Sequence, residues 1–233
     1  MLSRRALLSA LALPALVGSL LASHWPHDGG ASRTGLGFRR PTRAHRTTTA
    51  QRLHREAPGT YIAELLAERD SVLERWADRG DAPVRVWIAP ADTLAGWRPA
   101  FADAVRGAFA EWDRLGLPVH FAVGDDSTAA DVRVRWVDSL PGSAAGVTDW
   151  RSDRHARLRS AVVRIAMRAS DGRPQDVRGV RAIALHEIGH LLGLGHSPND
   201  DDIMAPWVTA DALSARDRAT AVLLYELPPG RVR

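Results

Sequence analysis

The sequence predicts a single mixed, layered α/β domain behind a long N-terminal extension. Short runs of alternating apolar and polar residues are interrupted by one long helical pattern, and two further helical patterns close the chain. The 233 residues are enough for one substantial core. The chain has no cysteine, which excludes disulfides, cysteine metal ligands and a thiol nucleophile.

The positive charge is concentrated in the N-terminal quarter of the chain. Residues 24–59 carry seven arginines against two acids, whereas residues 60–233 carry 22 arginines against 25 acids. The formal net charge of +4 therefore does not describe the predicted domain, which is slightly acidic. A nucleic-acid-binding protein needs a basic folded face, so we do not expect nucleic acid as a partner.

Residues 1–23 have the pattern of an export signal. Arg4 and Arg5 precede an uncharged, mostly apolar run over residues 6–22, and the start loosely resembles a twin-arginine signal. We expect a secreted, extracellular protein; the alternative is an uncleaved N-terminal membrane anchor with the protein facing outside. Residues 24–59 are rich in Arg and Thr and poor in large apolar residues, which predicts a disordered linker or a prosegment.

Ordered structure is expected from about Thr60. Helical spacing of apolar residues predicts a helical lead-in over residues 60–80, before a main domain over 81–228 and a tail over 229–233. Period-two alternation predicts five strands, which lie around residues 84–88, 119–123, 132–136, 147 and 161–167. A helix from Arg98 to Leu115 is predicted between the first and second strands.

Two helices are expected after the last strand. Asp176 is the candidate N-cap of the first, which ends at Gly193. The second is expected from about Asp211 to Tyr225, with Ser214, Asp217 and Arg218 on its solvent-facing side.

The first of these helices carries the pattern HEIGHLLGLGH, from His186 to His196. Residues four apart share a helix face, so His186 and His190 present their imidazoles to one point. His196 can join them only if the chain reverses, which Gly193 permits because glycine tolerates left-handed backbone angles. Three neutral imidazoles and one open position are typical of a catalytic zinc site, with Glu187 placed to act as general base on a bound water.

This extended motif resembles that of the metzincin metallopeptidases. Ile203-Met204-Ala205-Pro206 resembles their methionine turn, which implies that Met204 supports the site from below without binding metal. Ser197, after the third histidine, is similar to the residue found in matrixins and related bacterial secreted peptidases. The resemblance covers roughly residues 81–228. It implies a metzincin-like zincin domain with a twisted five-stranded mixed sheet, three main helices, an active-site helix and a methionine turn.

The resemblance also implies a function, a zinc-dependent endopeptidase that hydrolyses peptide bonds of proteins with one catalytic zinc ion. A protein or peptide substrate would lie antiparallel to an edge strand, against Ala145, Gly146 and Val147, with Pro206 nearby. The alternative is a non-catalytic zinc-binding or protein-interaction module on the same scaffold. Glu187 argues against that alternative, because zinc binding alone does not need this carboxylate.

Other features of the matrixin family are not expected here. Latency through a cysteine on the zinc is impossible in a chain that has none. Only Asp149, Asp153 and His155 stand in the segment where animal matrixins hold further ions, so structural calcium or a second zinc is not expected. We expect a monomer.

Overall fold

A six-stranded mixed sheet forms the framework of the domain. The structure is a computed structural model that describes residues 3–5, 48–80, 82–91 and 94–232. The strand order is β1-β6-β7-β5-β3-β4. Their bounds are β1 (Ser3–Arg5), β3 (Val84–Ile88), β4 (Phe121–Gly124), β5 (Val132–Val137), β6 (Gly146–Ser152) and β7 (Leu158–Ala166). Strands β4, β3, β5 and β7 run parallel, and β6 is antiparallel to β7. The five strands β3 to β7 confirm the predicted five-stranded mixed sheet.

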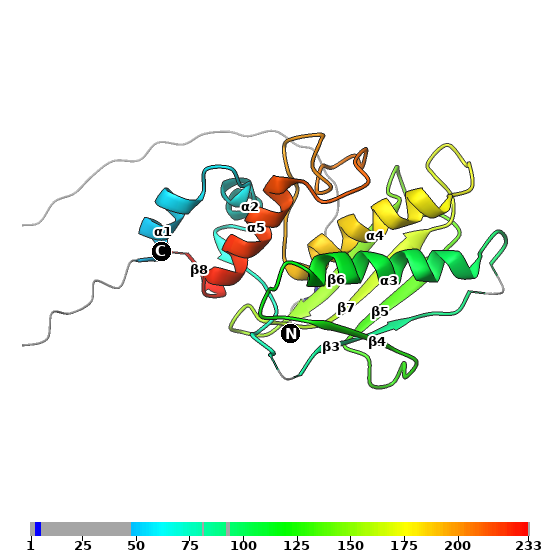
Figure 1. Ribbon diagram of the computed structural model, residues 1–233, viewed down its shortest axis with the longest axis horizontal. Helices are drawn as coiled ribbons and strands as arrows, with labels where there is room; N and C mark the ends of the chain where they lie inside the picture. Colours follow the sequence, from blue (N-terminus) through cyan, green and yellow to red (C-terminus); the bar gives the residue numbers. More distant parts are fainter. Residues whose placement is uncertain (1–2, 6–47, 81, 92–93, 233) are drawn as a thin grey trace, which may run out of the picture. The chain divides into compact units, whose positions relative to one another are not determined.

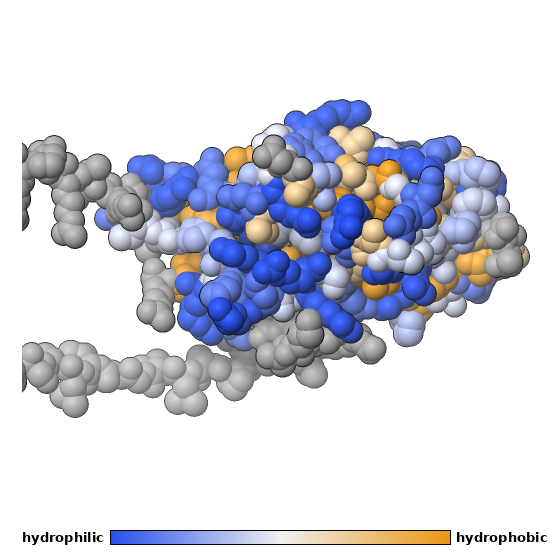
Figure 2. Space-filling view, turned by 90° about the horizontal axis from the view of Figure 1, so that it is seen from below, coloured by the Kyte–Doolittle hydropathy of each residue, from blue (hydrophilic) through white to orange (hydrophobic). Residues whose placement is uncertain are grey.

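Two long helices, α3 (Pro99–Asp113) and α4 (Val177–Leu192), lie side by side and cover one face of this sheet (Figure 1). The alternation of apolar and charged residues along the strands decides which side chains they cover. In β3, Val84 and Val86 are buried whereas Arg85 is exposed, and in β5 Val134 is buried whereas Arg135 is exposed. Figure 2 shows a face of the molecule on which hydrophilic residues predominate and apolar residues form separate patches.

The remaining elements bring the start and the end of the described domain together. They are α1 (Thr49–Glu56), α2 (Ile62–Glu68), β2 (Val72–Leu73), α5 (Ala215–Glu226) and β8 (Gly230–Arg231). Strand β2 pairs with β8, so that Val72 lies opposite Arg231. Helix α2 contacts α5, and the side chain of Arg52 in α1 donates to the backbone oxygen of Glu226 at the end of α5 (3.0 Å).

Several predicted boundaries are wrong. A disordered linker or a prosegment is predicted through residue 59, and the disorder is contradicted from Thr48 onward, where a capping box starts α1 and the Thr48 side chain accepts a hydrogen bond from the N–H of Gln51. The lead-in over 60–80 is helical only to Glu68 and then enters β2, and the expected tail over 229–233 contains β8. Strands β2 and β8 pair with each other, and pairing between segments so far apart in the sequence leaves no local pattern of apolar residues.

The predicted export signal or anchor over residues 1–23 lies outside the described residues except for Ser3–Arg5, which pair with β6 at Asp149–Arg151. Most of the predicted linker is likewise outside them. Among the described helices, none combines the length and the apolar character needed to cross a membrane.

Candidate active site

Helix α4 begins and ends where its sequence predicts. The side chain of Asp176 accepts a hydrogen bond from the N–H of Gly179 (2.7 Å), which satisfies one of the unpaired donors at the helix start. Gly193 ends the helix with φ +106° and ψ 7°. This left-handed conformation turns the chain back toward the helix, and the next three residues deliver His196.

The turn brings three imidazoles together. His186, His190 and His196 can each offer one ring nitrogen, and these atoms all lie within 4.8 Å of one another. His186 and His190 are buried, whereas the side chain of His196 is 23% exposed. The predicted triad is therefore assembled, with one of its members open to solvent.

Backbone carbonyls fix the orientation of two of the rings. His186 Nδ1 lies 2.8 Å from the Ile203 oxygen, and His190 Nδ1 lies 3.0 Å from the Leu194 oxygen. These contacts assign the proton to Nδ1 and leave Nε2 as the lone-pair donor. The two Nε2 atoms lie 3.0 Å apart, so they converge on one point.

The electrostatics of the triad suit a metal ligand set. Burial is the main cause that lowers the pKa of His186 to about 4 and the pKa of His190 well below its ordinary value. Burial also lowers the pKa of His196, although the Glu68 carboxylate opposes this shift. The rings are therefore neutral at pH 7 and can donate lone pairs. Three imidazoles are the ligand set of catalytic zinc, and these residues fit that ion.

Glu187 faces the sheet beside the triad. Its Oε2 accepts a hydrogen bond from Thr148 Oγ1 of β6 (2.6 Å). Gly146 of the same strand makes room for it, because a Cβ atom there would lie 2.5 Å from Glu187 Oε1. Burial raises the pKa of Glu187 to about 8, and the hydrogen bond from Thr148 opposes this shift. The carboxyl group is thus a buried group that can hold or release a proton near neutral pH.

The segment after His196 forms a floor beneath α4. Met204 is fully buried, and its backbone oxygen accepts from the N–H of Ser197 (2.8 Å). A Cβ atom on Gly189 would lie 2.2 Å from Met204 Sδ, so a glycine is needed where the methionine packs against the helix. Met204 therefore lies where the resemblance to the methionine turn implies.

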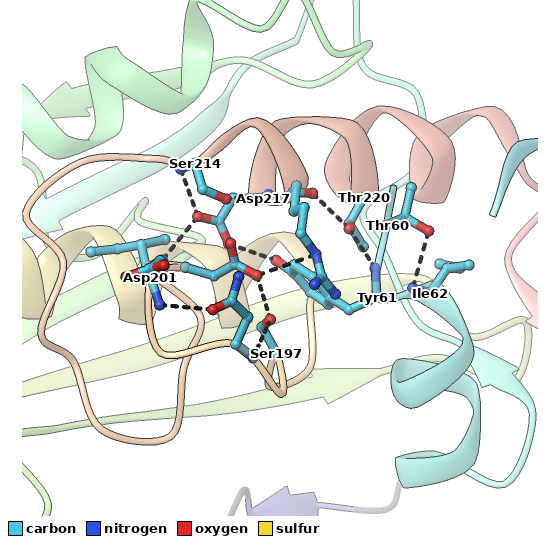
Figure 3. A network of polar contacts seen from close by, with 12 residues as sticks. Thr60, Tyr61, Ile62, Ser197, Asp201, Ser214, Asp217 and Thr220 are labelled. Carbon is cyan, nitrogen blue, oxygen red and sulfur yellow. Dashed lines mark hydrogen bonds and ion pairs between the residues drawn. The ribbon is translucent and has the colours of Figure 1, made fainter. Parts of the chain in front are cut away.

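Asp217 anchors this floor (Figure 3). Its Oδ2 accepts from the N–H groups of Ile203 (2.9 Å) and Ser214 (2.8 Å), and its Oδ1 accepts from the hydroxyl of Tyr61 (3.1 Å). Asp217 is fully buried, so the prediction that it lies on the solvent-facing side of the last helix is wrong. That helix also starts at Ala215 rather than near Asp211, with Ser214 as its N-cap. Three hydrogen-bond donors compensate for the burial of this carboxylate. Two of them come from outside the helix, so the spacing of residues along the helix does not reveal them.

Of the residues predicted to contact substrate, Gly146 lies against Glu187. Gly146 and Val147 begin β6, and the oxygen of Ala145 accepts from the N–H of Ala166 in β7 (2.9 Å). The pairing between β1 and β6 covers only Asp149–Arg151. Pro206 is half-buried, directly after the buried floor. Contact of these four residues with substrate stays a prediction.

The three polar residues noted for further ions make other contacts. Asp149 forms an ion pair with Arg164, and Asp153 forms one with Arg159 (2.7 Å). His155 Nε2 lies 2.9 Å from Arg154 Nε. In the described part of the chain, the one cluster of potential metal ligands is the histidine triad.

Three residues of the site were not identified from sequence. Thr148 touches Glu187, Asp217 ties down the floor, and Glu68 of α2 accepts a hydrogen bond from the backbone N–H of His196 (3.2 Å). No local pattern marks Thr148 or Glu68, because their partners lie 39 and 128 residues away in the chain. The spacing between Ser214 and Asp217 does carry a signal, that of a capping box.

Comparisons with known proteins agree with this geometry. The matrixin family model matches residues 92–226, more than half of the chain. The metalloendoproteinase 1-MMP of Arabidopsis thaliana is 32% identical over 110 residues, a match that covers 43% of this chain and 30% of the plant protein. The chain thus matches less than a third of the length of that relative. With its zincin sheet, its histidine triad and this match, the chain belongs to the matrixin family.

Proposed function

We propose that this protein is a zinc-dependent endopeptidase that cleaves peptide bonds of protein or peptide substrates. One observation carries the proposal. Three neutral imidazoles converge on one point beside the buried carboxyl group of Glu187, which contacts the first residues of β6. A module that only bound zinc would have no use for Glu187, whose placement requires both Thr148 and the space at Gly146. The matrixin family and the printed name of the plant relative support the same activity.

We assign His186, His190 and His196 as the ligands of one zinc ion. When bound there, zinc would lower the pKa of a coordinated water and polarise the substrate carbonyl. Glu187 then accepts the proton of the attacking water and passes it to the leaving nitrogen. Glu187 ionises more readily beside a cation, which counteracts the effect of burial on its pKa. Thr148 holds one carboxyl oxygen, and this fixes the direction in which the other points.

The substrate is proposed to lie along the start of β6. The backbone of Ala145, Gly146 and Val147 offers hydrogen-bonding groups that pair with an extended peptide without selecting its side chains. Pro206 is proposed to border the site on the side of the floor. Met204 and Gly193 act on the fold of the site rather than on the substrate.

The test compares Glu187→Gln with the wild type. We expect the variant to bind one equivalent of zinc and to lose hydrolysis of casein, since the triad remains and the base is gone. Glu64→Gln, which removes an exposed acid from α2, serves as the control and should keep full activity. A Glu187→Gln protein that hydrolyses casein at the wild-type rate would refute the mechanism. Zinc binding without hydrolysis by the wild type would favour the non-catalytic alternative.

We also propose that the protein is exported and works outside the cell as a monomer. The support is the sequence pattern of residues 1–23, with Arg4 and Arg5 before an uncharged run. N-terminal sequencing of the protein recovered from the culture medium tests this. A product that starts after residue 23 fits a cleaved signal, whereas a full-length product in the membrane fraction fits the anchor. The molar mass of the purified protein, measured by light scattering, tests whether it is a monomer.

A further inference from the structure

We propose that the segment Tyr61–Trp76, which precedes the family-matched region, is a permanent part of the fold around the zinc site, and that Glu68 within it is the positioning residue of His196. The proposal rests on the function assigned to the triad. It is independent of the resemblance, since the matrixin match begins at residue 92.

Glu68 contacts His196 twice. The backbone N–H of His196 donates to Glu68 Oε2 (3.2 Å), and His196 Nδ1 lies 3.8 Å from Glu68 Oε1. In the other two histidines of the triad, Nδ1 faces a backbone carbonyl. His196 faces a carboxylate instead, so its ring is held by a charged group from a helix more than 100 residues earlier.

The distance of 3.8 Å is that of an ion-pair contact and is longer than a hydrogen bond. Glu68 therefore acts on the imidazole through its negative charge, and on the backbone of the same residue through the hydrogen bond. A carboxylate behind a ligating histidine increases the basicity of the ligand nitrogen and fixes the ring. Loss of such a partner typically weakens metal binding by about 10- to 100-fold.

The loop after α4 is shaped to receive this segment. A Cβ atom on Gly195 would lie 2.5 Å from Glu68 Oε2 and 3.1 Å from Leu65 Cδ1. A Cβ atom on Gly193 would lie 2.1 Å from the backbone oxygen of Glu74. Gly193 is therefore needed for the close approach of the Glu74 backbone, in addition to the chain reversal, and Gly195 leaves the space that the Glu68 carboxylate occupies.

Between these two glycines, Leu194 is engaged through its backbone. Its oxygen accepts from Arg69 Nη2 (2.9 Å) and also lies 3.0 Å from His190 Nδ1. Arg69 in turn lies over the ring of Trp150 in β6, 4.8 Å from its centroid. Glu68 thus contacts His196 directly, and the next residue, Arg69, shares the Leu194 oxygen with His190.

Removal of a prosegment must not expose the hydrophobic core. Removal of Tyr61–Trp76 would expose it. Tyr61, Leu65, Leu73 and Trp76 are each at most 1% exposed. Trp76 Nε1 donates to the backbone oxygen of Leu191 in α4 (3.0 Å). Cleavage after Glu68 would remove the contacts of α2 from the loop and leave apolar surface uncovered. The mature enzyme therefore keeps the chain from Tyr61 onward.

The first experiment measures zinc affinity in the full chain by competition with a chromophoric chelator. Glu68→Gln keeps an oxygen for the N–H of His196 and removes the charge, whereas Glu68→Ala removes both. We expect the zinc Kd to rise about 10-fold in Glu68→Gln and further in Glu68→Ala, within about 100-fold. Glu64→Gln, one turn earlier on the exposed side of α2, should leave the Kd unchanged.

The absorption spectrum of the cobalt-substituted protein distinguishes the positioning role, because it would not change if Glu68 only stabilised the fold. The visible absorption bands of bound Co²⁺ should shift in Glu68→Gln and stay unchanged in Glu64→Gln. A Glu68→Gln protein with the wild-type zinc Kd and cobalt spectrum overturns the positioning role. If the wild type itself bound no zinc at the triad, the proposed function would fail instead, so the two failures are distinguishable.

The second experiment sequences the N-terminus of the catalytically active protein. We expect it to begin at or before Tyr61. A fully active form that starts after Glu68 overturns the claim that the segment is permanent.

Discussion

Replacement of Gly193 by alanine tests how the zinc-site turn is built, because two independent penalties meet there. The first is conformational: Gly193 has φ +106°, and placing an L-residue in left-handed backbone costs about 1–2 kcal/mol. The second is steric: the new Cβ atom would lie 2.1 Å from the oxygen of Glu74, whereas real Cβ contacts stay above 3.0 Å. Since the obstacle is backbone, β2 or the turn must move, and overpacking of this kind costs about 1–3 kcal/mol.

The sum predicts that Gly193→Ala lowers the free energy of unfolding by about 2–5 kcal/mol. The carboxylate of Glu74 accepts from Trp150 Nε1 (3.1 Å) and Ser152 Oγ (2.6 Å), so a displaced Glu74 also strains two contacts to β6. Urea denaturation of the zinc-loaded and the chelator-treated protein measures the change. We expect a larger loss in the zinc-loaded protein, because the turn also carries His196.

Alanine substitutions at two other glycines distinguish the conformational penalty from the steric one. Gly116 has φ +66° and open space around its Cβ position, so Gly116→Ala should show only the conformational cost of about 1–2 kcal/mol. Gly107 lies on the exposed side of α3 with open space, and Gly107→Ala should stabilise the protein by up to about 1 kcal/mol. If Gly193→Ala is no less stable than Gly116→Ala, the close approach of Glu74 has no energetic weight and the reasoning is wrong.

Three further predictions concern the floor and the base. Met204→Leu should lower the free energy of unfolding by less than about 1.5 kcal/mol, a near volume-conserving change, and isothermal titration should still find one bound zinc. Asp217→Ala should lower it by about 3 kcal/mol or more in urea denaturation, because three donors lose their acceptor at about 1–3 kcal/mol each; a loss under 1 kcal/mol would contradict the network. In the metal-free protein, the pKa of Glu187 is raised from 4.5 to about 8, so its carboxyl stabilises the fold below pH 4.5 and this contribution is lost as the pH rises toward 8. The free energy of unfolding of the metal-free wild type should therefore fall relative to that of Glu187→Gln between pH 5 and 8, by at most about 4 kcal/mol at about 1.4 kcal/mol per pH unit. If the free energies of unfolding of the two proteins change in parallel with pH, the raised pKa of Glu187 is excluded.

Where a structural feature depends on neighbours in sequence, it could be predicted. The cap at Asp176, the end of α4 at Gly193 and the shared face of His186 and His190 all follow from signals within a few residues. The helix α1 was predictable in principle, since Thr48 and Gln51 have capping-box spacing, but the scarcity of large apolar residues favoured disorder.

What depends on distant segments could not be predicted. The burial of Asp217 results from a tyrosine 156 residues earlier and from the turn before the helix. The contact of Thr148 with Glu187 follows from how β6 packs against α4. Glu68 is an exposed acid at the end of α2. A single sequence without contacts contains no signal that pairs it with His196.

The contacts of Asp217 have a consequence for the order of events during synthesis. A nascent chain that has emerged as far as Met204 already carries all three histidines, yet it lacks the carboxylate that ties the floor to Tyr61. Strand β2 also cannot form its pair until β8 has been synthesised, because Val72 pairs with Arg231. Contacts of such long sequence separation form late and slowly. We therefore expect the proposed zinc site to be complete only after the last helix has been synthesised, and a chain that stops before Asp217 to lack the proposed peptidase activity.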